Sequence, residues 1–477
     1  MAKRNYSRRD IVGSLAAVPL TGLAACAAPS QLARMTRNDA DVIVIGAGLA
    51  GLHAAYLLEN AGQKVMIVEG NDRTGGRLHT LDNLPGAPDA GGIQVGASYQ
   101  RFNAIADRLN VERYLPDESI GGYLYDIRGA SMLAKDWPGH PKNMLSPAEQ
   151  KTEPASLLFA TLRGLPKLAD IADWMDSTSA AIDVPLGQWL RANGASNEAI
   201  RLINTNLNGD TLASMSALHM QRTLAMYGAA AKADPGPTKF VRGGSQRMTD
   251  AMTAQLKSDI LLNTPVMGIR ENADLVEVAL ADGRKLRASQ VVCTAPLTVL
   301  RDMKIDTALP IAARTAISKL PYTKASFVFL RTTDAFWLND GLPEYIWSDD
   351  PLLGRVFTLN GDAPLLKIWT NGPAAQALDQ MDQKDAAAQI ISRIETIRPS
   401  ARGKLSYLDS FSWQKQPFAR GIYHHIGVGT GAPLAALVRH EGKRLHFAGE
   451  HMTQLAPGME GALESAERVS ARILATA

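Results

Sequence analysis

Cysteine is almost absent from this chain of 477 residues, which contains only Cys26 and Cys293. We expect Cys26 to be either lipidated or removed with the N-terminal segment, and Cys293 alone cannot form an internal disulfide. No Cys or His spacing typical of zinc sites occurs, and we predict no bound metal. Cys293 lies in an apolar stretch, which favours a small buried hydrophobic side chain over a nucleophile.

An excess of charge of one sign is also missing. The chain has 50 Lys and Arg against 47 Asp and Glu, a formal net charge of +3. This excess comes from residues 1–25, which hold Lys3, Arg4, Arg8 and Arg9 against Asp10. The remainder is neutral, so we predict no nucleic-acid partner. The hydrophobic content of 46% is ordinary for a globular protein long enough for two domains.

The N-terminal segment, residues 1–38, is predicted to be an export signal and tether rather than part of the fold. Arg8 and Arg9 precede an apolar run, residues 12–25, that is too short and too interrupted to span a membrane. It resembles a bacterial twin-arginine signal, a route that exports folded proteins. Residues 23–26 (LAAC) resemble a lipobox, which implies a periplasmic protein lipid-anchored at Cys26 and joined by a tether. The alternative is ordinary cleavage after Ala27.

Residues 41–52 (DVIVIGAGLAGL) combine an apolar strand, a glycine-rich turn and the start of an apolar helix. In this layout Gly46 permits the turn, Gly48 lets the backbone approach a pyrophosphate, and Gly51 lets the helix pack on the strand. Glu69 follows the second strand, residues 64–68, where a carboxylate accepts hydrogen bonds from ribose hydroxyls. The pattern predicts a bound dinucleotide.

Further segments distinguish between flavin and nicotinamide. Residues 73–77 (RTGGR) and 89–96 (DAGGIQVG) are not needed by a nicotinamide site. With residues 243–246, 291–297, 413–423 (WQKQPFARGIY) and 447–467, which begins FAGE, they run in order from about residue 40 onward. In that order they resemble the flavin-containing amine oxidase family of monoamine, polyamine and L-amino acid oxidases.

The resemblance implies FAD and a set of residues along it. Besides Gly46, Gly48, Gly51 and Glu69, these are Arg77, Gly91, Gly92, Ile93, Gln94, Val266, Gly449, Glu450, Gly458 and Met459. Tyr423 matches one aromatic wall of the substrate cage, and Gly458 stands where the second wall is expected. Ile422 stands where some members carry the cysteine that bonds the flavin, so we predict non-covalent FAD.

The resemblance also implies a lysine that holds a water against the flavin. The family spacing puts Phe327 at that position, and Lys324 lies three residues earlier. On a strand Lys324 would face the other way, so either a local bulge brings it in or the enzyme works without it. Tyr423 and Lys324 are the candidate catalytic residues. Of the adjacent His424 and His425, at most one can face a ligand.

The residue at position 94 bears on whether the substrate carries a carboxylate. In L-amino acid oxidases an arginine two residues after the second glycine of the GG segment grips the substrate carboxylate. This chain has Gln94 there, which predicts an amine without an α-carboxylate unless Arg222 or Arg355 enters the site from elsewhere.

The fold is predicted to be α/β, with a Rossmann-like FAD-binding domain of the glutathione-reductase type and a discontinuous α+β substrate-binding domain. Residues 39–100, 240–297 and 436–477 are assigned to the first, and residues 101–239 and 298–435 to the second. Apolar spacing predicts helices in the first insertion. In the second it predicts strands at residues 326–331 and 365–369 and a helix at residues 385–397.

The predicted function is oxidation of an amine to an imine that water hydrolyses to a carbonyl. The partners are a small-molecule amine and either O2 or a redox protein as electron acceptor, with the membrane touched only through Cys26. One alternative is an enzyme like the desaturases and porphyrinogen oxidases, which act on greasy hydrocarbons. Another is a lipid-anchored protein that binds flavin without amine oxidase activity.

Overall fold

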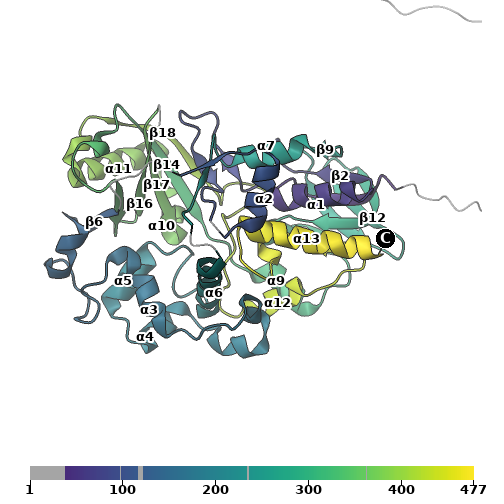
Figure 1. Ribbon diagram of the computed structural model, residues 1–477, viewed down its shortest axis with the longest axis horizontal. Coiled ribbons are helices and arrows are strands. Elements are labelled where there is room, and N and C mark those ends of the chain that lie inside the picture. The colour runs from purple at the N-terminus through teal and green to yellow at the C-terminus, as the bar shows by residue number, and fades with distance from the viewer. Residues whose placement is uncertain (1–37, 97, 116–121, 234–235, 361–362, 477) are drawn as a thin grey trace, which may run out of the picture. The chain divides into compact units, whose positions relative to one another are not determined.

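The computed structural model describes residues 38–96, 98–115, 122–233, 236–360 and 363–476 (Figure 1). The predicted twin-arginine motif and lipobox, with Arg8, Arg9 and Cys26, lie outside these ranges. Within them, none of the helices combines the length and apolarity that crossing a bilayer requires.

A sheet of eight strands has a parallel centre that contains the dinucleotide motif. Its parallel strands, in spatial order, are β9 (Asp259–Leu261), β2 (Val65–Val68), β1 (Ala40–Ile45), β12 (Lys285–Cys293) and β19 (Leu445–Phe447). The first half of β12 also pairs with β11 (Val276–Leu280). Beyond β11 the sheet extends to β10 (Val266–Glu271), which pairs with β13 (Lys304–Asp306) at the edge.

Strand β1 is apolar on both faces because both faces are covered. Val42 and Val44 enter a core with α1 (Leu49–Asn60) and α13 (Met459–Thr476), while Ile43 and Ile45 enter a second core. Figure 1 shows α1 and α13, from opposite ends of the chain, running side by side. The predicted α/β class and the Rossmann-like unit are confirmed.

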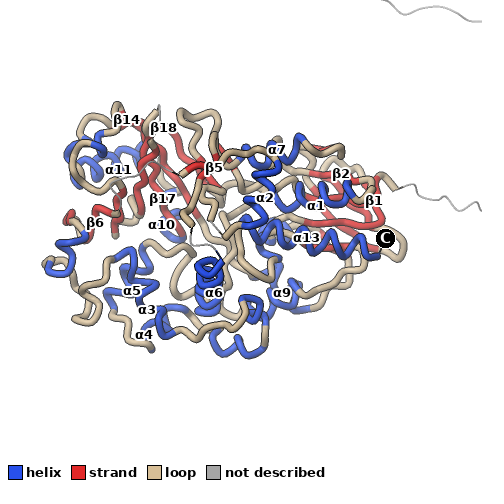
Figure 2. Tube along the Cα trace, in the orientation of Figure 1, coloured by secondary structure: helices blue, strands red, loops and turns tan. Residues whose placement is uncertain are grey.

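A second, seven-stranded sheet carries the other half of the site. Its order is β18 (Leu405–Ser412), β14 (Ala325–Thr332), β17 (Leu365–Asn371), β16 (Arg355–Leu359), β15 (Tyr345–Ser348), β6 (Tyr123–Ile127) and β7 (Ala130–Met132). Figure 2 shows β14, β17 and β18 of this sheet as red strands. One face packs on α11 (Gln383–Ile397) through aliphatic side chains. The other face is aromatic, with Phe327, Phe329 and Trp369.

The sequence predicted β14, β17 and α11 but not β6 and β7, which come from the first insertion and join the sheet through a parallel pairing of β6 with β15. That insertion also forms α3 (Leu157–Thr161), α4 (Leu186–Ala192), α5 (Asn197–Thr205) and α6 (Ala217–Ala233). The remaining helices are α2 (Gln100–Arg108), α7 (Gln246–Ala254), α8 (Leu297–Leu300), α9 (Ile311–Lys319), α10 (Gly372–Leu378) and α12 (Gly431–Val438), and the short strands are β3 (His79–Thr80), β4 (Asp89–Gly91), β5 (Arg113–Tyr114) and β8 (Phe240–Val241). The domain boundaries stay a prediction.

Candidate active site

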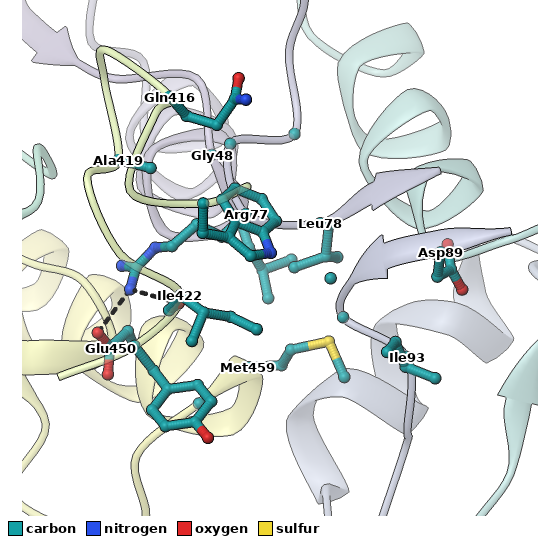
Figure 3. Close-up of a pocket in the computed structure, with 18 of the residues that line it drawn as sticks. Gly48, Arg77, Leu78, Asp89, Ile93, Gln416, Ala419, Ile422, Glu450 and Met459 are labelled. Carbon is teal, nitrogen blue, oxygen red and sulfur yellow. Dashed lines mark hydrogen bonds and ion pairs between the residues drawn. The ribbon is translucent and has the colours of Figure 1, made fainter. Parts of the chain in front are cut away.

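A cavity of about 960 Å³ extends from the glycine turn after β1 to the aromatic face of the second sheet. It brings together most of the residues predicted to bind the cofactor. Those that line it are Gly46, Gly48, Glu69, Arg77, Gly91, Gly92, Ile93, Gln94, Val266, Gly449, Glu450, Gly458 and Met459, together with Tyr423. Gly51 lies behind the wall. Figure 3 shows Arg77, Ile93, Glu450 and Met459 around this space.

The glycine turn is fixed by close packing. Gly46 has φ +102°, and a Cβ there would lie 2.5 Å from Thr294 Oγ1. A Cβ on Gly51 would lie 1.9 Å from the Gly46 carbonyl oxygen, so helix α1 needs glycine to approach the strand. Gly48 differs, because the nearest atom to its Cβ position is Gly76 Cα at 3.8 Å. The approach to the turn over Gly48 is therefore open.

Glu69 braces this turn against β2. Its Oε2 accepts a hydrogen bond from the Ala47 N–H at 2.7 Å, and its Oε1 accepts one from the Asn71 N–H at 2.8 Å. The carboxylate is buried yet still lines the cavity. Its binding of the adenosine ribose stays a prediction.

A buried ion cluster joins residues distant in the sequence. Arg77 Nη1 donates to Glu450 Oε1 at 2.7 Å and to the Ile422 carbonyl oxygen at 3.3 Å (Figure 3). His424 Nδ1 lies 2.5 Å from Glu450 Oε2. Burial alone would raise the pKa of Glu450, but the His424 imidazole and the Arg77 guanidinium outweigh it and hold that pKa well below its ordinary value. The cluster fixes the wall next to Tyr423.

His424 and His425 face different partners, as strand geometry predicted. His425 Nδ1 lies 3.0 Å from Thr323 Oγ1, and neither histidine is among the residues that line the cavity.

The far end of the cavity is an aromatic chamber, which we define by Tyr99, Tyr123, Tyr227, Tyr345, Phe357, Trp369 and Tyr423. Burial raises the pKa of Tyr423 to about 12. Because glycine has no side chain, the sequence predicted no second aromatic wall at Gly458. In the structure the Tyr99 hydroxyl lies close by, 3.2 Å from where a Cβ on Gly458 would be. Tyr99 therefore occupies part of the place where the second cage wall was expected.

Lys324 lies away from this cavity. Its Nζ is 3.7 Å from Asp210 Oδ2, and it is not among the lining residues. Phe327 occupies the position where the family resemblance predicted a lysine, and its ring is buried in the aromatic face of the sheet.

A different lysine, Lys367, reaches the cavity from the neighbouring strand. In the pairing of β14 with β17 it lies opposite Phe329, and its Nζ is 4.2 Å from the centre of the Phe327 ring. The Nζ donates to the Asp89 carbonyl oxygen at 2.6 Å. Burial lowers the pKa of Lys367 to about 7. In the sequence, the feature that points to a buried Lys367 is its place within the mainly apolar segment 365–371.

Residues 49–474 match the family model described as flavin containing amine oxidoreductase. The chain belongs to this family. Among curated relatives, the probable flavin-containing monoamine oxidase A of Dictyostelium discoideum is 24% identical over 91% of this chain and 97% of its own length. The L-amino-acid oxidase of Siganus canaliculatus is 26% identical over 91% and 85%. The structure of cyclohexylamine oxidase from Brevibacterium oxydans IH-35A has a TM-score of 0.78 at 23% identity, covering 92% of this chain and 99% of that one, and shows the shared fold.

The family implies FAD, and the residues of this amine oxidoreductase fit it. Helix α1 has no side-chain cap and no acid in its first turn, so its N-terminal N–H groups suit a pyrophosphate. Gly48 leaves the approach to them open, and Glu69 lies where the adenosine ribose is expected. Met459 and Gly449 also line the cavity.

Proposed function

We propose that this protein oxidises the C–N bond of an amine to an imine, which water hydrolyses to a carbonyl, using non-covalent FAD. Electrons pass to O2 or to a periplasmic acceptor. The observation that carries the proposal is one continuous cavity that begins at the dinucleotide turn and ends in the aromatic chamber with Tyr423 and Lys367.

FAD, when bound, would accept a hydride, that is one proton and two electrons, from the carbon next to nitrogen, and the nitrogen would lose a proton to give the imine. The protein must bind the substrate with its amine deprotonated and shielded from water. The rings of the aromatic chamber line the space for the substrate and would limit its contact with water. Lys367, with its pKa lowered to about 7 by burial, takes the proton from the arriving ammonium group.

A panel of primary and secondary amines tests the proposal. The purified yellow protein should lose its flavin absorbance when a substrate amine is added without oxygen. Absorbance should return with O2 or with a cytochrome, and the faster of the two identifies the class of acceptor. A flavin that no amine or amino acid bleaches would overturn the proposal.

The mode of flavin attachment is a separate expectation. Ile422 cannot form a thioether, and Cys293 is fully buried at the end of β12, outside the residues that line the cavity. Burial raises the pKa of its thiol to about 12. Acid precipitation should therefore release all of the flavin into the supernatant, whereas yellow colour kept in the washed pellet would show a covalent bond.

Export is proposed from Arg8, Arg9 and Cys26. Replacing both arginines by lysine should retain the active enzyme in the cytoplasm. Cys26→Ala should still be exported but should leave the membrane fraction, since it removes the site of lipidation. If wild type and Cys26→Ala fractionate alike as free periplasmic protein, the anchor is wrong and ordinary cleavage after Ala27 stands.

A further inference from the structure

Arg355 is a cation in the aromatic chamber, and the part of the chain that the structure describes offers it no acidic partner. It lies on β16 opposite Trp369, and its guanidinium carbon is 5.1 Å from the centre of the Trp369 ring. One terminal nitrogen donates to Asn208 Oδ1 at 2.8 Å. The Nε is buried and has no hydrogen-bond partner.

Three other arginines in the described part of the chain that are largely buried have carboxylate or several carbonyl partners. Arg398 pairs with Asp340 at 2.6 Å, and Arg77 pairs with Glu450. Arg222, which lies outside the cavity lining, donates to the carbonyl oxygens of Thr453 and Leu455.

The charge of Arg355 is therefore costly in the protein alone. Among the described residues, no carboxylate lies within ion-pair distance of it. Burial lowers its pKa, and the Tyr423 and Tyr123 phenols oppose this. Arg355 is half-buried as a residue, but its Nε is fully buried, so a guanidinium with one neutral acceptor and an aromatic face gains stability when an anion joins it.

The position of Arg355 selects what that anion can be. It lines the same cavity as Tyr423, where the amine is proposed to react. A plain ammonium ion would be repelled by the guanidinium, whereas a molecule with both charges would not be. Gln94, which also lines the cavity, offers no charge.

We propose that Arg355 binds a carboxylate of the substrate, so that the amine oxidised here also carries a carboxylate group. This inference rests on the proposed function. The planar guanidinium, with its free Nε, can hold a carboxylate through two parallel hydrogen bonds. Arg355 on the second sheet thus supplies the positive charge that Gln94 lacks.

The test compares matched pairs that differ only by the carboxylate: 2-phenylethylamine with L-phenylalanine, tryptamine with L-tryptophan, and 3-methylbutylamine with L-leucine. The wild type should prefer the amino acid in at least one pair. Arg355→Gln should lower kcat/KM for that amino acid by about 100-fold or more and leave the simple amine unchanged or faster, because charge-assisted hydrogen bonds are lost. Arg355→Lys should fall between, since it keeps the charge without the fork.

Two controls separate this inference from the proposed function. Arg331→Gln removes an exposed arginine of the same sheet, outside the cavity lining, and should change neither rate. Benzoate and neutral benzamide, titrated into the holoenzyme by calorimetry, test carboxylate binding without turnover. Benzoate should bind the wild type and weaken at least 10-fold in Arg355→Gln, with benzamide unaffected.

Each outcome has one meaning. Equal or better turnover of the simple amines, with benzoate binding unchanged in Arg355→Gln, would overturn the role of Arg355 while amine oxidation stands. Benzoate binding that depends on Arg355, without oxidation of any amine or amino acid, would support the carboxylate site and refute the proposed function.

Discussion

Replacing Glu450 by glutamine is expected to lower the free energy of unfolding by about 3–5 kcal/mol, because it leaves a buried arginine without its counter-charge. Arg77 donates to Glu450 at 2.7 Å, and His424 lies 2.5 Å from the other carboxylate oxygen. The same change should empty much of the flavin site, since Glu450 lines it. Urea unfolding and the flavin-to-protein ratio measure the two effects.

The matched control is the double variant Arg77→Met/Glu450→Leu. It removes both charges, so it should lose less stability than Glu450→Gln alone. A single variant as stable as the wild type would show that the cluster contributes little.

The cluster also predicts an acid limit. The pKa of Glu450 is held below its ordinary value of 4.5, so its contribution to stability is full above about pH 4.5 and is lost as the pH falls through the lower folded value. Glu450→Gln should lack this part of the acid loss.

Replacing Lys367 by methionine is expected to lower kcat/KM by about 10²- to 10⁴-fold, the usual contribution of general acid–base catalysis. In the wild type kcat/KM should rise as the pH increases through about 7, because only the neutral Lys367 amine accepts a proton. In Lys367→Met that limb should vanish, and the pH profile distinguishes this from loss of packing. Flavin content should be measured in parallel.

Lys324→Met provides the comparison. Its ammonium pairs with Asp210 outside the cavity lining, so the limb near pH 7 should persist in this variant. If the limb instead disappears in Lys324→Met and persists in Lys367→Met, the proton acceptor is Lys324.

Local patterns predicted the dinucleotide half of the site. The glycine turn and Glu69 line one cavity, because a strand, a turn and a helix that follow one another fix their own geometry. Arg77, Gly449 and Glu450 were placed in this cavity through the family resemblance.

The substrate half depends on pairing between strands, which sequence spacing does not reveal. Lys367 and Arg355 enter the chamber because β14, β17 and β16 pair in one register, with Trp369 opposite both Phe327 and Arg355. Alternation showed that Lys324 and Phe327 face opposite sides, but it could not show which neighbouring strand supplies a lysine. Tyr99 likewise reaches Gly458 across a long sequence separation.

The packing of α13 on α1 has a consequence for biosynthesis. Residues 41–52 are translated long before Gly449, Glu450 and Met459, which line the same cavity. A nascent chain that ends before β19 has the glycine turn but lacks this part of the lining. We therefore expect it to hold the dinucleotide weakly and the cofactor to enter only after α13 has been synthesised.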